Sequence, residues 1–213
     1  MNAQFFSKER VLNNENFDKK RLSWGFILGF NNLDYKFTYN EPVEDIEVQK
    51  NVNFNVGLLS NLRINDYFDL RFEPLVIFST RGVVFPEIER NNDREVKASY
   101  VYMPLLRKIS TKRLNNFKPF LIGGVATAIN LSSNERNPDD NLAGQFRTKT
   151  NVNFYELGVG IDFYLPYFKF SPSIRGIFAT NNELQPDNSP DSVFTGPIDT
   201  MKTRGVFLNF TFQ

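Results

Sequence analysis

The segment 51–62 alternates between apolar and polar side chains. Val52 and Phe54 fall on one parity, and Asn53 and Asn55 fall on the other. Successive side chains of a β-strand point to opposite faces of a sheet, so the segment predicts a strand with one apolar and one polar face. Its length also suits a bilayer crossing, which takes about 9–11 tilted strand residues. If the pattern recurs, the chain is predicted to form a membrane barrel.

The pattern does recur, and it predicts eight strands. Their expected ranges are 22–39, 51–62, 68–80, 96–107, 117–130, 152–164, 168–180 and 203–212. The parity shifts around Asn31 to Asp34, which predicts either a bulge or the passage of the strand out of the membrane. Pro104 lacks a backbone donor, so a local irregularity is expected in the fourth strand.

The connections between these strands alternate in length. The long ones are 40–50, 81–95, 131–151 and 181–202, and the others are short or of medium length. Outer-membrane barrels combine short periplasmic turns with longer extracellular loops. We therefore predict an all-β, eight-stranded antiparallel up-and-down transmembrane β-barrel over residues 22–213. Residues 1–21 are expected to form an N-terminal periplasmic arm, with the remnant of an export signal at 1–3.

A soluble lipocalin-like barrel or sandwich is the alternative, because its strands alternate in the same way with the faces exchanged. Aromatic residues on the apolar parity favour the membrane barrel, since they form its interfacial girdles. Charged residues gather on the opposite parity, and Phe212 places an aromatic residue near the C-terminus. These three features predict a barrel with an apolar exterior in an outer membrane, with the N-terminus in the periplasm.

The composition excludes several functional classes. The chain has 23 Phe and 8 Tyr but neither Cys nor His, so thiol nucleophiles, His-based triads and the usual zinc or haem ligands are absent. A net charge of +1 argues against a nucleic-acid partner. We expect no enzyme activity, no cofactor and no metal site.

Seven charged residues share the polar parity and are expected to face the lumen. One hypothesis makes a pair such as Glu73 and Asp162 an acid–base couple. The favoured interpretation is a structural salt-bridge network, because eight strands leave an interior just wide enough for side chains. Lumen-facing glycines would make room for bulky neighbours. The predicted network consists of Asp69, Arg71, Glu73, Glu156, Asp162, Lys169 and Arg175.

Basic and aromatic residues of the arm and of the turn 108–116 are candidates for contacts with a periplasmic partner. The alternatives are contacts with lipid phosphates and, for the arm, an ordinary frayed terminus. The candidates are Phe5, Phe6, Phe17, Lys19, Lys20, Arg21, Lys112 and Arg113.

The segment Phe17–Asn31 resembles the first strand of the PorT (also SprT) family of Bacteroidota outer-membrane proteins. Four further segments are similar to recurrent signatures of its wider barrel superfamily: Leu70–Pro74, Tyr102–Leu106, Lys118–Gly124 and Gly158–Phe163. The chain departs from the common pattern in ending on Gln213 after the aromatic Phe212. The resemblance implies a role in type IX protein secretion and gliding motility, and it supplies no catalytic residues.

Two functions are therefore expected. The first is a non-enzymatic component of the secretion machinery that acts through contacts with other outer-membrane or periplasmic secretion proteins and with outer-membrane lipid. The alternative is a small pore or ligand-binding barrel unrelated to secretion.

Overall fold

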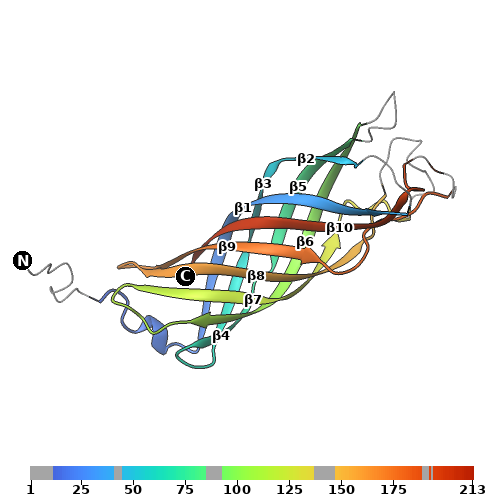
Figure 1. Ribbon diagram of the computed structural model, residues 1–213. Coiled ribbons are helices and arrows are strands. Elements are labelled where there is room, and N and C mark those ends of the chain that lie inside the picture. The colour runs from blue at the N-terminus through green and yellow to red at the C-terminus, as the bar shows by residue number, and fades with distance from the viewer. Residues whose placement is uncertain (1–11, 41–44, 85–92, 137–146, 189–191, 193) are drawn as a thin grey trace, which may run out of the picture.

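The computed structural model describes residues 12–40, 45–84, 93–136, 147–188, 192 and 194–213. Within them a single sheet follows one short 3-10 helix, η1 (Phe17–Lys19) (Figure 1). No helix in this part of the chain is long and apolar enough to cross a membrane. The strands are β1 (Leu22–Tyr39), β2 (Glu47–Lys50), β3 (Val52–Arg63), β4 (Phe68–Phe72), β5 (Leu75–Val84), β6 (Asp93–Ser110), β7 (Phe117–Asn130), β8 (Asn151–Tyr164), β9 (Lys169–Ala179) and β10 (Ile198–Phe212).

The sheet closes on itself through β1. This strand pairs antiparallel with β10 along one edge, with Phe26 opposite Phe212, and with β3 along the other, with Phe26 opposite Leu58. Every described pairing between neighbouring strands is antiparallel. The ten segments form eight barrel strands, because β2 leads directly into β3 and β4 into β5. The predicted fold class is confirmed.

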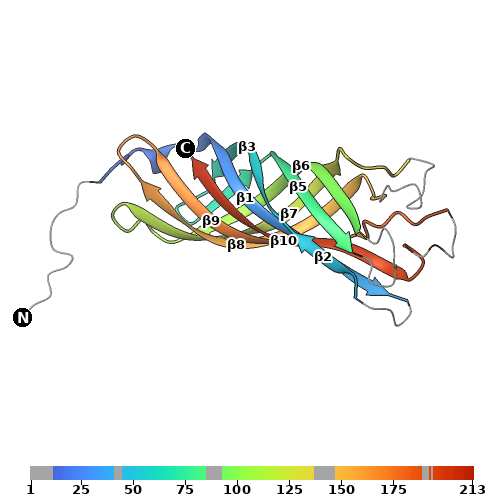
Figure 2. The same cartoon turned by 90° about the horizontal axis from the view of Figure 1, so that it is seen from above.

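The two ends of the barrel differ. Short connections at 64–67, 111–116 and 165–168 lie at one end, named here the turn end, together with η1 and the C-terminus (Figure 1, Figure 2). The strand ends that lead into the four long connections lie at the other end, named the loop end. Several strands run further toward the loop end than the alternation predicts, since β10 begins at Ile198 and β2 occupies part of the first expected loop. Backbone pairing continues there after the alternation of apolar residues has ended.

The irregularity expected at Pro104 lies in the neighbouring strand instead. β6 runs without a break past Pro104, whereas the strand beside it is interrupted between β4 and β5 at Glu73 and Pro74. The register from Phe72 to Leu75 places Pro104 opposite Glu73. Pro104 has no N–H to donate back to Glu73, and Pro74 has none to donate toward β3, where its carbonyl accepts from Leu58 at 3.0 Å. Only the Glu73 N–H bridges the gap, donating to the Pro104 carbonyl at 3.3 Å.

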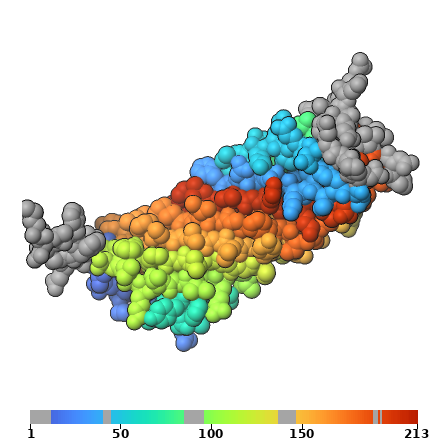
Figure 3. Space-filling model, in the orientation of Figure 1, coloured from blue at the N-terminus to red at the C-terminus, as the bar shows by residue number. Residues whose placement is uncertain are grey.

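The outer wall is apolar along most of the barrel. Trp24, Phe54, Leu157 and Val206 all project outward, and Leu157 is 68% exposed. The space-filling view shows one side of this wall, formed by neighbouring strands from β7 to β1 (Figure 3). Asn55 and Asn61, on the opposite parity of β3, are buried inside. The strand that carries the alternation at 51–62 therefore faces outward with its apolar side.

The parity shift at Asn31 to Asp34 is not a bulge. The β1–β10 register runs continuously from Phe26 to Thr38 and shifts only at Thr38 and Tyr39. Beyond Asp34 the apolar side chains point inward: Tyr35 is buried, while Lys36 on the other face is exposed. The loop end therefore has a core and a polar surface, as a soluble protein has. This change marks the level at which β1 leaves the membrane.

Two lumen-facing glycines make room for large neighbours, as expected. A Cβ on Gly158 would lie 2.6 Å from the side chain of Arg175, and one on Gly160 would lie 2.4 Å from the ring of Phe120. Backbone oxygens of β9 are equally close, at 2.4 and 2.7 Å, so the neighbours have little space to move. These glycines are packing positions rather than parts of a phosphate-binding loop.

Replacing Gly160 with alanine is expected to destabilise the barrel by about 1–3 kcal/mol, because the added methyl overpacks the lumen. The temperature at which the folded, fast-migrating band disappears on a denaturing gel should fall. Gly82→Ala is the matched control, since its Cβ would meet only the Gln49 side chain at 3.2 Å. Equal losses in the two variants would contradict the packing role of Gly160.

Candidate functional site

The turn-end half of the lumen contains a first group of buried ion pairs centred on Glu73. This carboxylate lies in the break between β4 and β5, where it keeps the inward parity of Arg71 and Leu75. Arg175 donates to it from β9 at 2.6 and 3.2 Å, and Arg71 lies 3.0 Å away. Arg175 also pairs with Glu156 at 3.6 Å, and the Tyr102 hydroxyl donates to Glu156 at 3.3 Å. All are almost completely buried.

A second group is centred on Asp162 of β8. Lys108 donates to its carboxylate at 2.5 Å, Ser171 donates at 2.7 Å, and Lys169 lies 3.9 Å away. The sequence interpretation placed Lys108 in the turn that follows its strand, and so missed this pair. β6 extends to Ser110, which keeps Lys108 on the inward parity.

Six of the seven predicted lumen charges thus belong to these two groups. Asp69, the seventh, is buried as predicted but takes no part in either group of ion pairs. Buried charges are tolerated when they are paired and hydrogen-bonded. Since Glu73 and Asp162 each accept from their own buried cations, in two separate groups of ion pairs, the geometry favours the structural interpretation over an acid–base couple.

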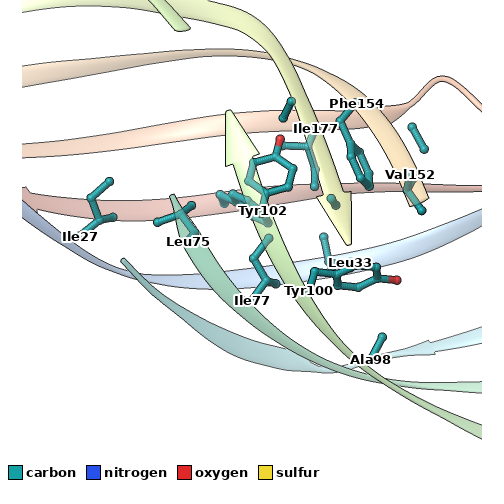
Figure 4. Close-up of a cluster of buried hydrophobic side chains, with 14 of the residues drawn as sticks. Ile27, Leu33, Leu75, Ile77, Ala98, Tyr100, Tyr102, Val152, Phe154 and Ile177 are labelled. Carbon is teal, nitrogen blue, oxygen red and sulfur yellow. The ribbon is translucent and has the colours of Figure 1, made fainter. Parts of the chain in front are cut away.

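The middle of the lumen is apolar, whereas the sequence pattern predicts charged residues and glycines in the interior. Ile27, the exception on the polar parity of its strand, is completely buried there. Tyr102 lies between the rings of Phe154 and Phe207, with ring centroids 5.6 and 6.0 Å apart. Figure 4 shows Tyr102, Phe154 and their aliphatic neighbours pointing into the interior from several strands. This apolar layer separates the ion pairs of the turn end from the loop end.

The loop end is closed by a third layer. Arg81 stacks on the Tyr35 ring at 3.8 Å and donates to the Tyr100 hydroxyl at 2.9 Å and to Thr203 Oγ1 at 3.1 Å. Glu183, from the connection between β9 and β10, accepts from the backbone N–H and the hydroxyl of Thr203 at 2.6 and 2.9 Å. Burial raises the pKa of the Glu183 carboxyl, although Arg81 and these hydrogen bonds act in the opposite direction. A long connection is thereby held inside the barrel mouth.

The arm covers the turn end. The Tyr164 hydroxyl donates to the Asp18 carboxylate at 2.8 and 2.9 Å, and the Phe17 ring meets Tyr164 edge-on. The Lys169 ammonium lies 4.4 Å from the centre of the Phe17 ring. Arg113 donates to the backbone carbonyl of Asn13. The part of the arm that the structure describes is therefore docked on its own barrel.

The candidate partner contacts fall into three groups. Phe5 and Phe6 lie outside the described residues. Phe17 and Arg113 are engaged with the barrel, as described above. Lys19, Lys20, Arg21 and Lys112 are exposed at the turn end, where they can meet a partner or lipid phosphates. Whether any of the eight binds another protein stays a prediction.

Within the described ranges, acidic residues form no group of three or more that could hold a metal ion. The lumen instead combines charge pairs, an apolar layer and a held loop. Such an arrangement makes the barrel rigid and fills its lumen with side chains.

Replacing Glu73 with glutamine is expected to cost about 3–5 kcal/mol of unfolding free energy, because two buried guanidinium groups lose their shared carboxylate. Urea unfolding in lipid vesicles, followed through the fluorescence of Trp24, measures the effect. Asp66→Asn is the control: Asp66 pairs with Arg63 and has a side chain that is 69% exposed, so its loss should cost less than about 1 kcal/mol. Similar costs for the two variants would contradict a structural network.

The comparisons with known proteins agree with the fold. Residues 2–185 match the family model described as "Outer membrane protein beta-barrel domain". The outer membrane protein OprG from Pseudomonas aeruginosa is similar in structure, with a TM-score of 0.53 and 13% identity over 89% of this chain and 94% of that one. Neisserial surface protein A is also similar, with a TM-score of 0.45 and 9% identity over 90% and 98%.

At these identities the structural similarity to OprG establishes the fold alone. No curated protein sequence matches the chain. The family match covers most of the chain, and the structure supplies the closed antiparallel barrel with its apolar outer wall. The chain belongs to the outer membrane protein beta-barrel domain family, and it is an eight-stranded barrel of a Gram-negative outer membrane.

Proposed function

We propose that this barrel is a non-enzymatic component of the type IX secretion machinery, in a Bacteroidota-type outer membrane, and that it acts through contacts with other secretion proteins. The single observation that carries the proposal is the closure of the lumen in three successive layers. A filled barrel offers a partner its two ends and its outer wall. The specific machinery is inferred from the resemblance to the PorT family.

The proposed orientation places the turn end in the periplasm and the loop end outside the cell. It is supported by the segregation of short and long connections to opposite ends, which is the arrangement of outer-membrane barrels. In this orientation the arm and the exposed basic residues of the turn end face the periplasm. A periplasmic partner with an acidic surface would meet them there.

The segment that carries the PorT resemblance, Phe17–Asn31, begins in the docked arm and ends in β1. Its first part is anchored through Phe17 and Asp18 at the turn end, and β1 is the strand that closes the barrel. An anchored arm presents its exposed side chains in a fixed position, which reduces the entropy lost when a partner binds. This arrangement supports a role for the arm in protein contacts.

Affinity purification of the tagged protein from native membranes in mild detergent tests the proposal. We expect other secretion components to be recovered with it. Reversing the charge of Lys19, Lys20 and Lys112 together should reduce their recovery at least about tenfold, since rim charges govern association. Arg136→Glu, at the loop end, is the control. Recovery of the native protein without secretion components would contradict the proposal.

A small pore is the alternative, and planar-bilayer recordings distinguish it. We expect no sustained current, because the apolar layer around Tyr102 and Phe154 blocks the middle of the lumen. Removing residues 1–20 should leave the barrel equally silent, since the arm covers only the turn end. Ohmic conductance of the native protein would favour the pore.

A further inference from the structure

The outer wall carries a row of charged side chains at the level where the strands leave the membrane. Arg204 of β10 lies directly opposite Asp34 of β1 on one side and Phe178 of β9 on the other. Arg204 and Lys50 both pair with the Asp34 carboxylate, at 3.0 and 3.1 Å. The side chains of the two cations remain about half exposed, at 50% and 49%.

The next outward-facing position toward the loop end adds two more cations. Lys36 and Lys202 are cross-strand partners, and neither forms an ion pair with a described residue. Like charges directly opposite each other on a sheet are destabilising. One carboxylate therefore faces a cluster of Lys36, Lys50, Lys202 and Arg204, named here the basic cluster. An anion bound between the lysines would relieve their repulsion.

A groove runs down the wall from this cluster. It has a volume of about 320 Å³. Gly176 of β9 lies opposite Val206 of β10. The glycine leaves room there for the Phe178 ring, which lies 3.2 Å from where a Cβ of residue 176 would be. The residues that line the groove are Asn32, Asp34, Lys50, Gly176, Phe178, Arg204, Gly205 and Val206.

The wall becomes apolar toward the turn end. Phe30 and Leu208 are paired on the same face of β1 and β10, and Ile174 continues the row on β9. All three are exposed on the outer wall. Figure 3 shows this face, where blue β1 and red β10 run side by side. The surface therefore has cations on the side nearer the loop end and apolar side chains on the side nearer the turn end.

We propose that this surface binds a phosphorylated glycolipid of the outer leaflet, of the lipid A type. Its phosphate would lie among the basic cluster, where Arg204 and the lysines can donate charge-assisted hydrogen bonds. An acyl chain would occupy the groove beside Val206 and pass onto the apolar wall. The phosphate of such a lipid would thus meet the basic cluster, and its acyl chain would meet the apolar part of the wall.

The inference uses the proposed orientation, because the basic cluster must face the outer leaflet. It does not use the secretion role. Loss of secretion partners in the purification above would leave the lipid site intact, and failure to bind lipid would leave the partner contacts intact. The results can therefore contradict one proposal without contradicting the other.

Native mass spectrometry of the full chain in detergent tests the site with three probes: lipid A, the same glycolipid without its phosphates, and inorganic phosphate. We expect the native protein to retain lipid A and to bind the other two at least about tenfold more weakly. The double variant K36Q/K202Q should bind lipid A at least about tenfold more weakly than the native chain does, because each basic residue contributes to attraction by anionic lipid.

The matched control is R136Q/K149Q, which removes two cations of the connection between β7 and β8 that do not line the groove and should leave lipid A retention unchanged. Heat-modifiable migration verifies that both variants are folded. Equal retention by K36Q/K202Q and the native chain would overturn the proposal. So would retention of the dephosphorylated glycolipid to the same extent, which would indicate acyl-chain contact alone. Equally tight binding of inorganic phosphate would indicate a free-anion site instead.

Discussion

Backbone pairing around a closed ring is the constraint on which the rest of this structure depends. A bilayer core has no water to satisfy a strand edge, so each N–H and C=O of a spanning strand needs a partner within the protein. β1 meets this need by pairing with both β3 and β10. The break between β4 and β5 falls where two prolines lack an N–H: Pro104 lies opposite Glu73, and Pro74 follows Glu73 in the break itself. Glu73 emerges from that break and becomes the centre of the larger ion-pair group.

A ring of eight strands leaves an interior about as wide as the side chains that fill it. That width explains why one lumen accommodates paired charges, an apolar layer and a held loop in succession. Each layer has its own kind of contact: carboxylates receive guanidinium and ammonium donors, aromatic rings pack on one another, and Glu183 receives the donors of Thr203. This filling of the interior supports the proposal that the barrel acts through its surfaces.

Those surfaces change character at the level of Asp34. Toward the turn end the wall is apolar and the interior carries the two groups of ion pairs. Toward the loop end the β1 side chains that point inward are aromatic, such as Tyr35, and the wall carries Lys36 and Lys202. β1 therefore has its apolar side chains on the outer face before Asp34 and on the inner face after it. The cations at the level of Asp34 are at the depth proposed for the lipid headgroups. The arm lies at the turn end, on the opposite side of the barrel.

The amino-acid sequence alone predicted the fold class, the six lumen charges that form ion pairs and the direction in which the 51–62 strand faces. Alternation with a period of two assigns each side chain to a face, and the aromatic residues on one parity and the charges on the other indicated which face is the outer one. The sequence also showed the parity shift at Asn31 to Asp34, but not its cause. Only the tertiary structure decided which charges pair, since Glu73 and Arg175 lie 102 residues apart. It likewise placed Lys108 inside the barrel, docked Phe17 on Tyr164 and gathered the basic cluster. These features depend on register and on strand ends, which a local pattern of polarity does not define.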